Sequence, residues 1–170
     1  PPVPTPGPCA VVCRLARATV PLCGSSNGAL FKPDRKKIPM RCEVIAIGTE
    51  LLLGQITDTN SSWIGEQLAL AGIDSLHQVK VGDNFDRIVE CIRHALSRAD
   101  AVITCGGLGP TQDDITREAI AEVLGVPLVR HPEIGERIRH MFESRGRIMP
   151  ENNLRQAEVP QGASTIAEQP

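Results

Sequence analysis

The sequence predicts an α/β fold with a mostly parallel sheet whose two faces are both covered by helices. From residue 41 onward, short apolar runs alternate with stretches in which apolar residues recur at helical spacing. Two of the runs, VIAI at 44–47 and AVIT at 101–104, are apolar at successive positions, which is typical of strands buried on both faces. Strands that alternate with helices pair in parallel through helical crossovers, so the helices must pack against the sheet.

The first half of this pattern contains two strands and one helix. Residues 43–47 are expected to form the first strand, which ends at Gly48, and the leucines at 51–53 are expected to be buried beneath the following turn. Residues 60–71 form a helix, because Ile64 and Leu68 share one face and Gly72 is a suitable stop. Residues 73–81 form the second strand.

The second half repeats the alternation. Asp83 or Asn84 can cap a helix in which apolar residues recur from position 85 to 96, and residues 101–104 form the third strand. A further helix over 115–123 is stopped by Gly125, and residues 126–129 are extended. Pro132 begins the last predicted helix, since proline is favoured in the first helical turn.

The charge of the chain is unevenly distributed. Residues 1–40 contain six Lys or Arg and one acid, a net of +5, whereas residues 41–170 contain twelve Lys or Arg and nineteen acids, a net of −7. An acidic body with one Trp and no Tyr argues against a nucleic-acid partner. No apolar run approaches the ~20 residues of a membrane span, so no membrane partner is expected.

Residues 1–40 are expected to be a disordered or non-native extension, with Met40 as the natural start. Eight of the fourteen prolines lie there and no hydrophobic period persists. A targeting segment and an ordered arm remain alternatives. The six cysteines contain no C-x-x-C pair, so we expect free thiols in a reducing compartment and a cytoplasmic protein.

The most informative segment is CGGLGPTQDDITREA at 105–119, a glycine-rich turn between a predicted strand and a predicted helix. Its glycines permit positive φ and close approach of a ligand to backbone N–H groups, and a helix N-terminus attracts phosphate. Asp113 and Asp114 would repel phosphate at the same place. A metal ion between the carboxylates and a phosphate reconciles the two features. The alternative is that Thr111 and Asp114 only cap the helix.

A second polar turn, residues 48–60, follows the first strand and is expected at the same edge of the sheet. Glu50 lies just past the strand end, where loops carry function more often than elsewhere. Asp58 and Thr59 precede the predicted helix, so an N-cap at either residue is an equal alternative to a ligand contact.

Four segments together resemble the competence/damage-inducible protein A (CinA) family. They are GTELLLGQITDTN at 48–60, VGDN at 81–84, GGLGPTQDDITREA at 106–119 and RGRIMPENNLRQA at 145–157. The resemblance implies a three-layer α/β/α sandwich of the molybdopterin-binding (MoaB/Mog-like) type over residues 41–170. It also implies an ADP-ribose pyrophosphatase-type hydrolase that needs a divalent metal, Mg²⁺ or Co²⁺, with potassium also implicated.

The resemblance implies a set of site residues. The predicted catalytic and metal-binding residues are Asp113, Asp114 and Glu50. The predicted ligand-binding residues are Gly48, Thr49, Asp58, Asn60, Gly106, Gly107, Gly109, Thr111, Asn152 and Asn153. The expected partner is a small phosphorylated nucleotide or pterin, and self-association is left open. For Asn152 and Asn153, a solvated helix start is the alternative.

Two other functions remain open at this point. One is a binding module for molybdopterin or a nucleotide phosphate that performs no hydrolysis. The other is an inactive fragment of a longer CinA protein, because family members continue past residue 165 with a further loop and many carry a nicotinamide-nucleotide amidase domain. We therefore expect the domain to be truncated at its C-terminal end.

Overall fold

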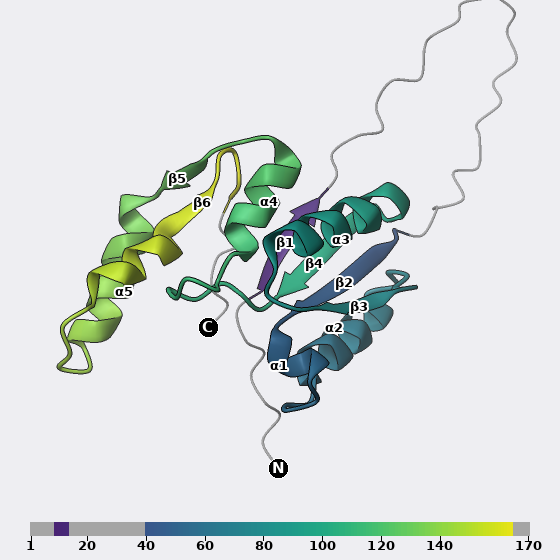
Figure 1. Ribbon diagram of the computed structural model, residues 1–170, viewed down its shortest axis with the longest axis horizontal. Helices are drawn as coiled ribbons and strands as arrows, with labels where there is room; N and C mark the ends of the chain where they lie inside the picture. Colours follow the sequence, from purple (N-terminus) through teal and green to yellow (C-terminus); the bar gives the residue numbers. More distant parts are fainter. Residues whose placement is uncertain (1–8, 14–39, 165–170) are drawn as a thin grey trace, which may run out of the picture.

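The computed structural model describes residues 9–13 and 40–164, and it places four strands in one sheet (Figure 1). The strand order is β1-β4-β2-β3, with β1 at Cys9–Cys13, β2 at Cys42–Ile47, β3 at Gln78–Val81 and β4 at Ala101–Cys105. β2 runs parallel to β3 and β4, whereas β1 is antiparallel to β4. The prediction of a mostly parallel sheet is therefore confirmed.

Strand β1 lies within the segment that was expected to be disordered. Its five residues pair with the whole of β4, from Cys9 opposite Cys105 to Cys13 opposite Ala101. At these residues the structure differs from the expectation, because the outer edge of β4 offers unpaired backbone groups that an extended segment can satisfy. The rest of the expected extension lies outside the described residues, apart from Met40.

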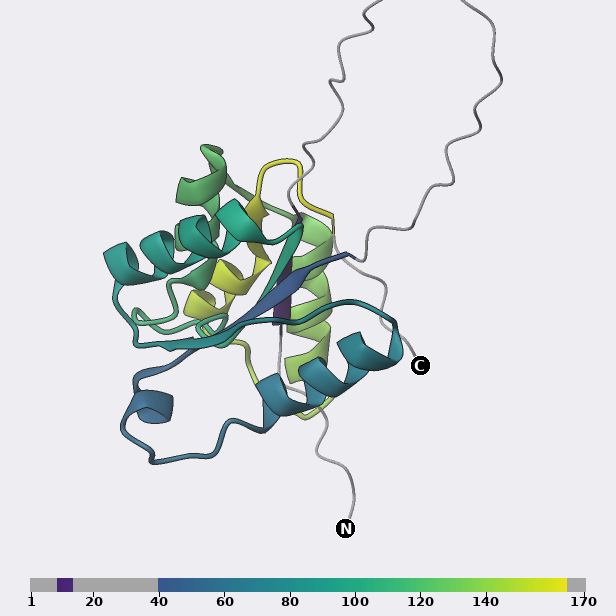
Figure 2. The ribbon, with the colours of Figure 1, turned by 90° about the vertical axis from the view of Figure 1, so that its right-hand side faces the viewer.

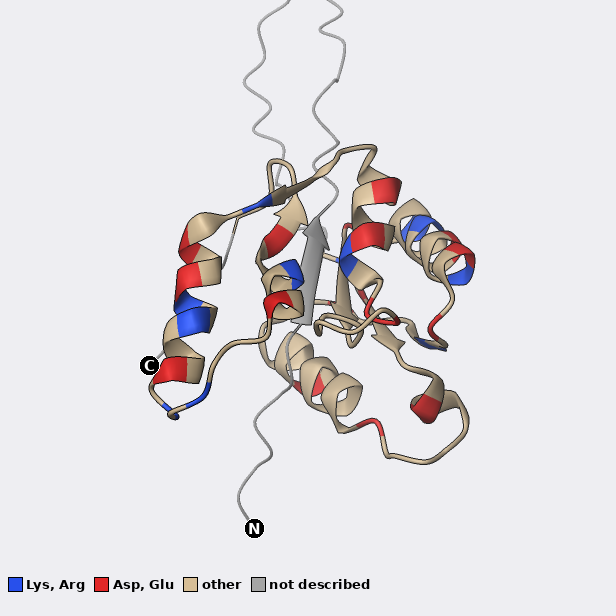
Figure 3. Ribbon diagram, turned by 60° about the vertical axis from the view of Figure 1, so that its left-hand side comes forward, with Lys and Arg blue, Asp and Glu red and all other residues tan. Residues whose placement is uncertain are grey.

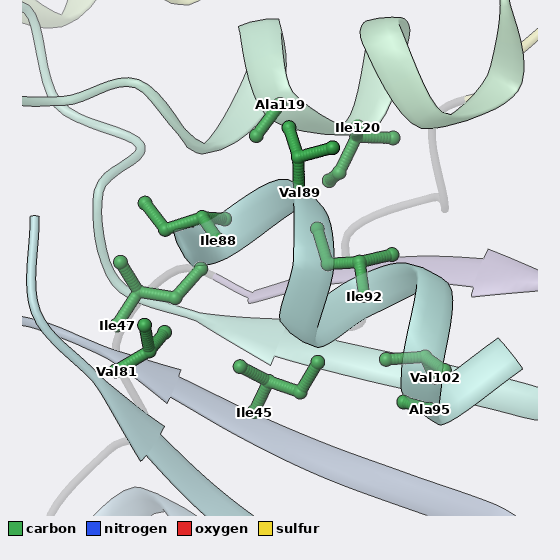
Figure 4. Close-up of a cluster of buried hydrophobic side chains, with 10 residues drawn as sticks. All are labelled: Ile45, Ile47, Val81, Ile88, Val89, Ile92, Ala95, Val102, Ala119 and Ile120. Atoms are coloured by element: carbon green, nitrogen blue, oxygen red, sulfur yellow. The ribbon is translucent and has the colours of Figure 1, made fainter. Parts of the chain in front are cut away.

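Helices cover both faces of the sheet, which gives the three-layer α/β/α arrangement (Figure 2). Helix α2 (Thr59–Leu70) packs Ile64 and Leu68 against Val44 on one face. Helices α3 (Phe85–Arg98) and α4 (Thr116–Leu124) lie on the other face. There they form the larger core, shown in Figure 4: Ile45, Ile47, Val81, Ile88, Val89, Ile92, Ala95, Val102, Ala119 and Ile120. Alternate residues of β2 thus enter opposite cores.

A smaller unit follows α4 and lies to one side of the sheet (Figure 1). It comprises β5 (Leu128–Arg130), helix α5 (Pro132–Glu143), the 3₁₀ helix η1 (Glu151–Ala157) and β6 (Glu158–Pro160). β5 and β6 pair as an antiparallel ribbon, and η1 packs against α5. Pro132 begins α5 as predicted, but η1 and β6 were not predicted.

Several local predictions need correction. The predicted strand over 73–81 is shortened to β3, because residues 74–77 make only one isolated bridge, between Asp74 and Arg41. Leu51 and Leu52 lie in the short helix α1 (Thr49–Leu52) and Leu53 follows it. The expectation that these leucines are buried is wrong, because Leu51 is only half-buried and the other two are exposed. Leu52 and Leu53 are 54% and 66% exposed, since the turn projects away from the sheet.

A buried carboxylate of the sheet pairs with a partly exposed arginine of α3. Glu43 on β2 is 2% exposed, and its carboxylate accepts hydrogen bonds from Arg98 Nε at 2.5 Å and Arg98 Nη2 at 2.9 Å. On the surface, basic and acidic residues are interspersed along the helices (Figure 3). In the described part of the chain, no helix has the length and apolar character that a membrane crossing requires.

Candidate ligand-binding site

Three loops meet at the carboxyl ends of β2, β3 and β4. Gly48 follows β2, and its N–H donates to Val81 O at the end of β3 at 2.9 Å. Thr49 N donates to Asp83 Oδ2 at 2.7 Å, and Asp83 N donates to Thr49 Oγ1 at 3.1 Å. Gly106 follows β4 and packs directly on the backbone of Ile47. The prediction that both glycine turns share one edge of the sheet is therefore confirmed.

The glycines of the loop over residues 106–115, here called the glycine loop, are required by close contacts. Gly106 and Gly107 have φ of 96° and 61°, in the left-handed region that favours glycine. A Cβ atom on Gly106 would lie 2.0 Å from Ile47 O, and one on Gly107 would lie 2.3 Å from Thr116 Oγ1. The glycines thus allow the loop to pack on β2 and on the start of α4.

Two arginines bind the carbonyl groups of the glycine loop. Arg117 on α4 is 6% exposed and donates to Leu108 O and, at 2.8 Å, to Gly109 O. Arg155 on η1 donates to Thr111 O. Burial lowers the pKa of Arg117, and the positive charge of Arg155 also lowers it, whereas nearby acids raise it. An arginine guanidinium group carries a positive charge at physiological pH.

The carbonyl groups of the loop accept hydrogen bonds, whereas some of its backbone N–H groups donate none within the described part of the chain. Among the described residues, the N–H groups of Gly107 and Leu108 donate to no acceptor. Gly106, Gly107, Leu108 and Gly109 are all partly exposed. Successive free N–H groups backed by positive charge form a suitable site for an anion.

The two adjacent aspartates differ in their surroundings. Asp114 accepts hydrogen bonds from Thr111 N at 2.8 Å, from Thr111 Oγ1 and from the N–H of Gly109. Desolvation acts to raise the pKa of Asp114, but these hydrogen bonds and the charge of Arg117 outweigh it, so the pKa is lowered. Asp113 is exposed and makes no hydrogen bond or ion pair with any described residue. Asp114 therefore organises the loop, whereas Asp113 is available to a ligand.

Thr111 does not cap α4, which was the alternative to a ligand role. Helix α4 begins at Thr116 after Ile115, and it has no side-chain cap. The Thr111–Asp114 contact instead closes a turn inside the glycine loop. Thr116 Oγ1 donates to Gly106 O at 2.8 Å, which fixes the start of the helix against the loop.

The predicted metal ligands do not form a closed cluster. The Glu50 carboxylate folds over Gly48, where a Cβ atom would lie 2.4 Å from Glu50 Oε1. Within residues 9–13 and 40–164, no three His, Cys, Asp or Glu side chains gather as a metal site made only of protein ligands would need. A magnesium-like ion is commonly held by one or two carboxylates together with substrate phosphates. A divalent ion at this edge of the sheet would therefore need a phosphorylated ligand to supply further oxygen atoms.

The other predicted ligand residues have structural contacts. Asp58 caps α2 by accepting from Ser61 N at 2.9 Å, and it lies 3.8 Å from Lys80 Nζ. Asn60 lies in the first turn of α2. Asn153 is 8% exposed and donates to Pro150 O at 3.3 Å, whereas Asn152 is exposed and accepts from Asn153. These contacts favour the cap for Asp58 and a role of Asn153 within η1.

Three residues at the site were missed by sequence reasoning. Asp83 was considered only as a cap, yet it binds Thr49. Arg117 lies three residues after Asp114, within the same motif, yet nothing in its local sequence predicts a contact with the loop carbonyls. Arg155 belongs to the RGRIMPENNLRQA segment, in which the two asparagines were the predicted ligand residues. Both arginines lie inside segments that carry the family resemblance, and a basic residue beside a predicted phosphate-binding loop was the signal that could have identified them.

A shallow hollow lies beside this network. It lies beside α4 and is lined by Phe85, Glu118, Ala121, Glu122, Gly125, Val126 and Leu128. Glu118 belongs both to this hollow and to the ion pair with Arg155. The glycine loop does not line the hollow, so the two are distinct features of the surface.

Comparison with known proteins identifies the family. The family model described as "Probable molybdopterin binding domain" matches residues 43–168. A "CinA-like protein" of Trichormus variabilis is 51% identical over 127 residues, which are 75% of this chain and 30% of the relative. A "CinA-like protein" of Nostoc sp. is 50% identical over 127 residues, again 75% of this chain and 30% of the relative. The chain thus spans about a third of the length of these curated relatives.

A solved structure supports the same assignment. The crystal structure of CinA from Thermoplasma acidophilum, a protein described as of unknown function, is 31% identical in sequence with a TM-score of 0.65. The match covers 71% of this chain and 71% of that chain. The chain therefore belongs to the CinA family, and residues 43–168 are its molybdopterin-binding-type domain.

Proposed function

We propose that this domain binds a small phosphorylated pterin or nucleotide at the glycine loop. One observation carries the proposal: the loop carbonyls are bound by Arg117 and Arg155, whereas the N–H groups of Gly107 and Leu108 are free of described partners. A phosphate or diphosphate group accepts such hydrogen bonds, and the two guanidinium charges behind the loop favour an anion. The family match supports a ligand of this class.

We further propose that the bound ligand is a nucleotide diphosphate such as ADP-ribose, and that it is hydrolysed with a divalent metal. Asp113, which has no described partner, and Glu50 would hold Mg²⁺ or Co²⁺ together with the diphosphate. The metal supplies charge neutralisation and a water of lowered pKa. The N–H groups of the loop would stabilise the negative charge that develops on the phosphoryl oxygens.

The alternative function is binding without hydrolysis. The incomplete carboxylate set favours it, since no three-ligand cluster exists among the described residues. In that case the same N–H groups hold the phosphate of a pterin and Asp113 contributes no chemistry. The two functions share the binding step and differ only in whether product appears.

Calorimetric titration with ADP-ribose, inorganic pyrophosphate and adenosine tests the binding step. We expect the first two to bind and adenosine to bind far more weakly, because it lacks phosphate. Binding of adenosine as tightly as ADP-ribose would contradict a phosphate site at the loop.

A product assay then separates the enzyme from the binding module. ADP-ribose is incubated with Mg²⁺ or Co²⁺, with and without K⁺, and release of AMP is measured. We expect Asp113→Asn to reduce turnover by at least about tenfold, while Asp86→Asn, a matched exposed acid at the start of α3, leaves it unchanged. Binding without AMP release would favour the receptor.

A further inference from the structure

Arg155 links the C-terminal unit to the glycine loop over a long sequence separation. Its Nη1 donates to Thr111 O, and its Nη2 lies 2.7 Å from Glu118 Oε1 and 3.5 Å from Asp114 O. A guanidinium group presents donors in a fixed planar fork, so it can hold several oxygens in one geometry. Arg155 therefore bridges the second half of the loop, the first turn of α4 and η1.

Arg117 performs the matching role on the first half of the loop. It binds the carbonyls of Leu108 and Gly109 from its buried position on α4. The carbonyls of Leu108, Gly109 and Thr111 thus all accept from guanidinium donors. Arg117 thus holds the peptide groups on either side of Gly109. Thr116 accompanies it at the start of α4: its Oγ1 donates to Gly106 O and its N–H to Gly107 O, the carbonyls of the peptide groups that carry the free N–H groups of Gly107 and Leu108.

We infer that Arg155 is a positioning residue for phosphate binding, an inference that rests on the proposed function. Arg155 does not contact the ligand in this proposal. It holds the Thr111–Asp114 turn, and Asp114 in turn accepts from the N–H of Gly109, next to the free N–H groups of Gly107 and Leu108. Pre-organised donors of this kind lose affinity when the groups that orient them are removed.

Glu118 complicates a simple test of Arg155. The Oε2 atom of Glu118 is buried and has no hydrogen-bond partner among the described residues, and its Oε1 accepts from Arg155. Removal of Arg155 alone therefore leaves a carboxylate unpaired and destabilises the fold for a reason unrelated to the loop. The double change Arg155→Met with Glu118→Gln removes both charges and avoids this cost.

The binding experiment uses inorganic pyrophosphate as the probe, with affinity and melting temperature measured for each variant. We expect Arg155→Met to weaken affinity about tenfold and to lower the melting temperature. The double variant should recover the melting temperature but not the affinity. Arg155→Lys should recover little affinity, because an ammonium group cannot reproduce the fork.

Arg130→Met is the matched control. Arg130 lies in the same C-terminal unit and pairs with Glu158 at 2.6 Å, but it has no contact with the loop. It should leave the affinity unchanged. If the double variant regains full affinity, or if Arg130→Met loses as much affinity as Arg155→Met, the positioning role is refuted.

Amide hydrogen exchange gives a readout that needs no ligand. Thr111 N donates to Asp114 Oδ2, so its exchange reports whether this turn is closed. Exchange at Thr111 should accelerate in Arg155→Met and in the double variant but not in Arg130→Met. Unchanged exchange overturns the positioning role itself. A wild-type chain that fails to bind pyrophosphate overturns the proposed function, and the exchange result remains informative about the loop.

Discussion

The substitution Gly107→Ala tests whether the glycine loop depends on close packing or only on backbone conformation. Gly107 has φ of 61°, and a Cβ atom there would lie 2.3 Å from Thr116 Oγ1. Thr116 is fully buried, so its side chain has little freedom to move. Gly146 is a matched control, because its φ is 64° and nothing lies within 4 Å of its Cβ position.

The expected magnitudes follow from these contacts. An alanine in the left-handed region costs about 1 kcal/mol at either position. At Gly107 the overlap with Thr116 adds about 2 kcal/mol, the typical cost of overpacking a core that cannot adjust. We therefore expect losses in unfolding free energy of about 3 kcal/mol for Gly107→Ala and about 1 kcal/mol for Gly146→Ala.

Urea denaturation at neutral pH, analysed by linear extrapolation, measures both losses. Combining Gly107→Ala with Thr116→Ala removes the overlapping oxygen, so the double variant should lose less than the two single changes together. Equal losses at Gly107 and Gly146 would refute the packing argument. Fully additive losses in the double variant would place the strain somewhere other than Thr116.

Three further predictions concern charged and titratable groups. The pKa of Asp114 is lowered in the folded state, so its ionised form stabilises the protein above its unfolded pKa of ~3.9 and this contribution is lost as the pH falls. Asp114→Asn should therefore flatten the loss of stability below pH 4 in acid titrations, and an unchanged slope would contradict this. Arg98→Met leaves the buried Glu43 without its main partner and should lower the unfolding free energy measured in urea denaturation. Adding Glu43→Gln should restore most of that loss, and no restoration would show that the charge is not the cause. Burial raises the pKa of the Cys91 thiol, and the negative charge of Glu43 raises it further. Iodoacetamide at pH 8 should therefore alkylate Cys91 more slowly in the folded chain than in urea. Equal alkylation rates would refute the raised pKa.

Much of the fold could be predicted from local sequence patterns. The apolar run at 44–47 predicted a strand buried on both faces, and β2 is buried throughout. Asn84 was one of two candidate caps for α3, and its side chain accepts from Arg87 N at 3.2 Å. Gly125 was predicted to stop α4, and it has φ of 67°. These features depend on a few neighbouring residues, which is why they can be predicted.

Features that depend on distant residues could not be predicted in this way. Glu43 interrupts an apolar strand, and its partner Arg98 lies 55 residues later. Leu52 and Leu53 are apolar, but the path of the turn leaves them exposed. The path of the turn could not be predicted from the sequence, because it depends on the hydrogen bonds by which Thr49 and Asp83 join two loops.

In the candidate site, too, features set by neighbouring residues could be predicted, whereas features set by distant residues could not. The glycine loop was predicted as a phosphate-binding turn, and its position at the sheet edge is confirmed. The contrast between Asp113 and Asp114 was not predictable, since adjacent identical residues differ only in what surrounds them. Arg155 was not predictable either, because its contact with Thr111 spans 44 residues.

The burial of Arg117 bears on how the site responds to its surroundings. A surface lysine loses most of its attraction for an anion as ionic strength rises, because the Debye length falls to about 3 Å at 1 M salt. Arg117 is 6% exposed, so mobile ions cannot gather around its charge. Pyrophosphate affinity should therefore decline only gently between low and high salt, and a steep decline would assign the attraction to exposed charges. At salt concentrations that screen exposed surface charges, the buried guanidinium group of Arg117 would still attract anions. The site could then distinguish anions by their shape and their hydrogen bonds.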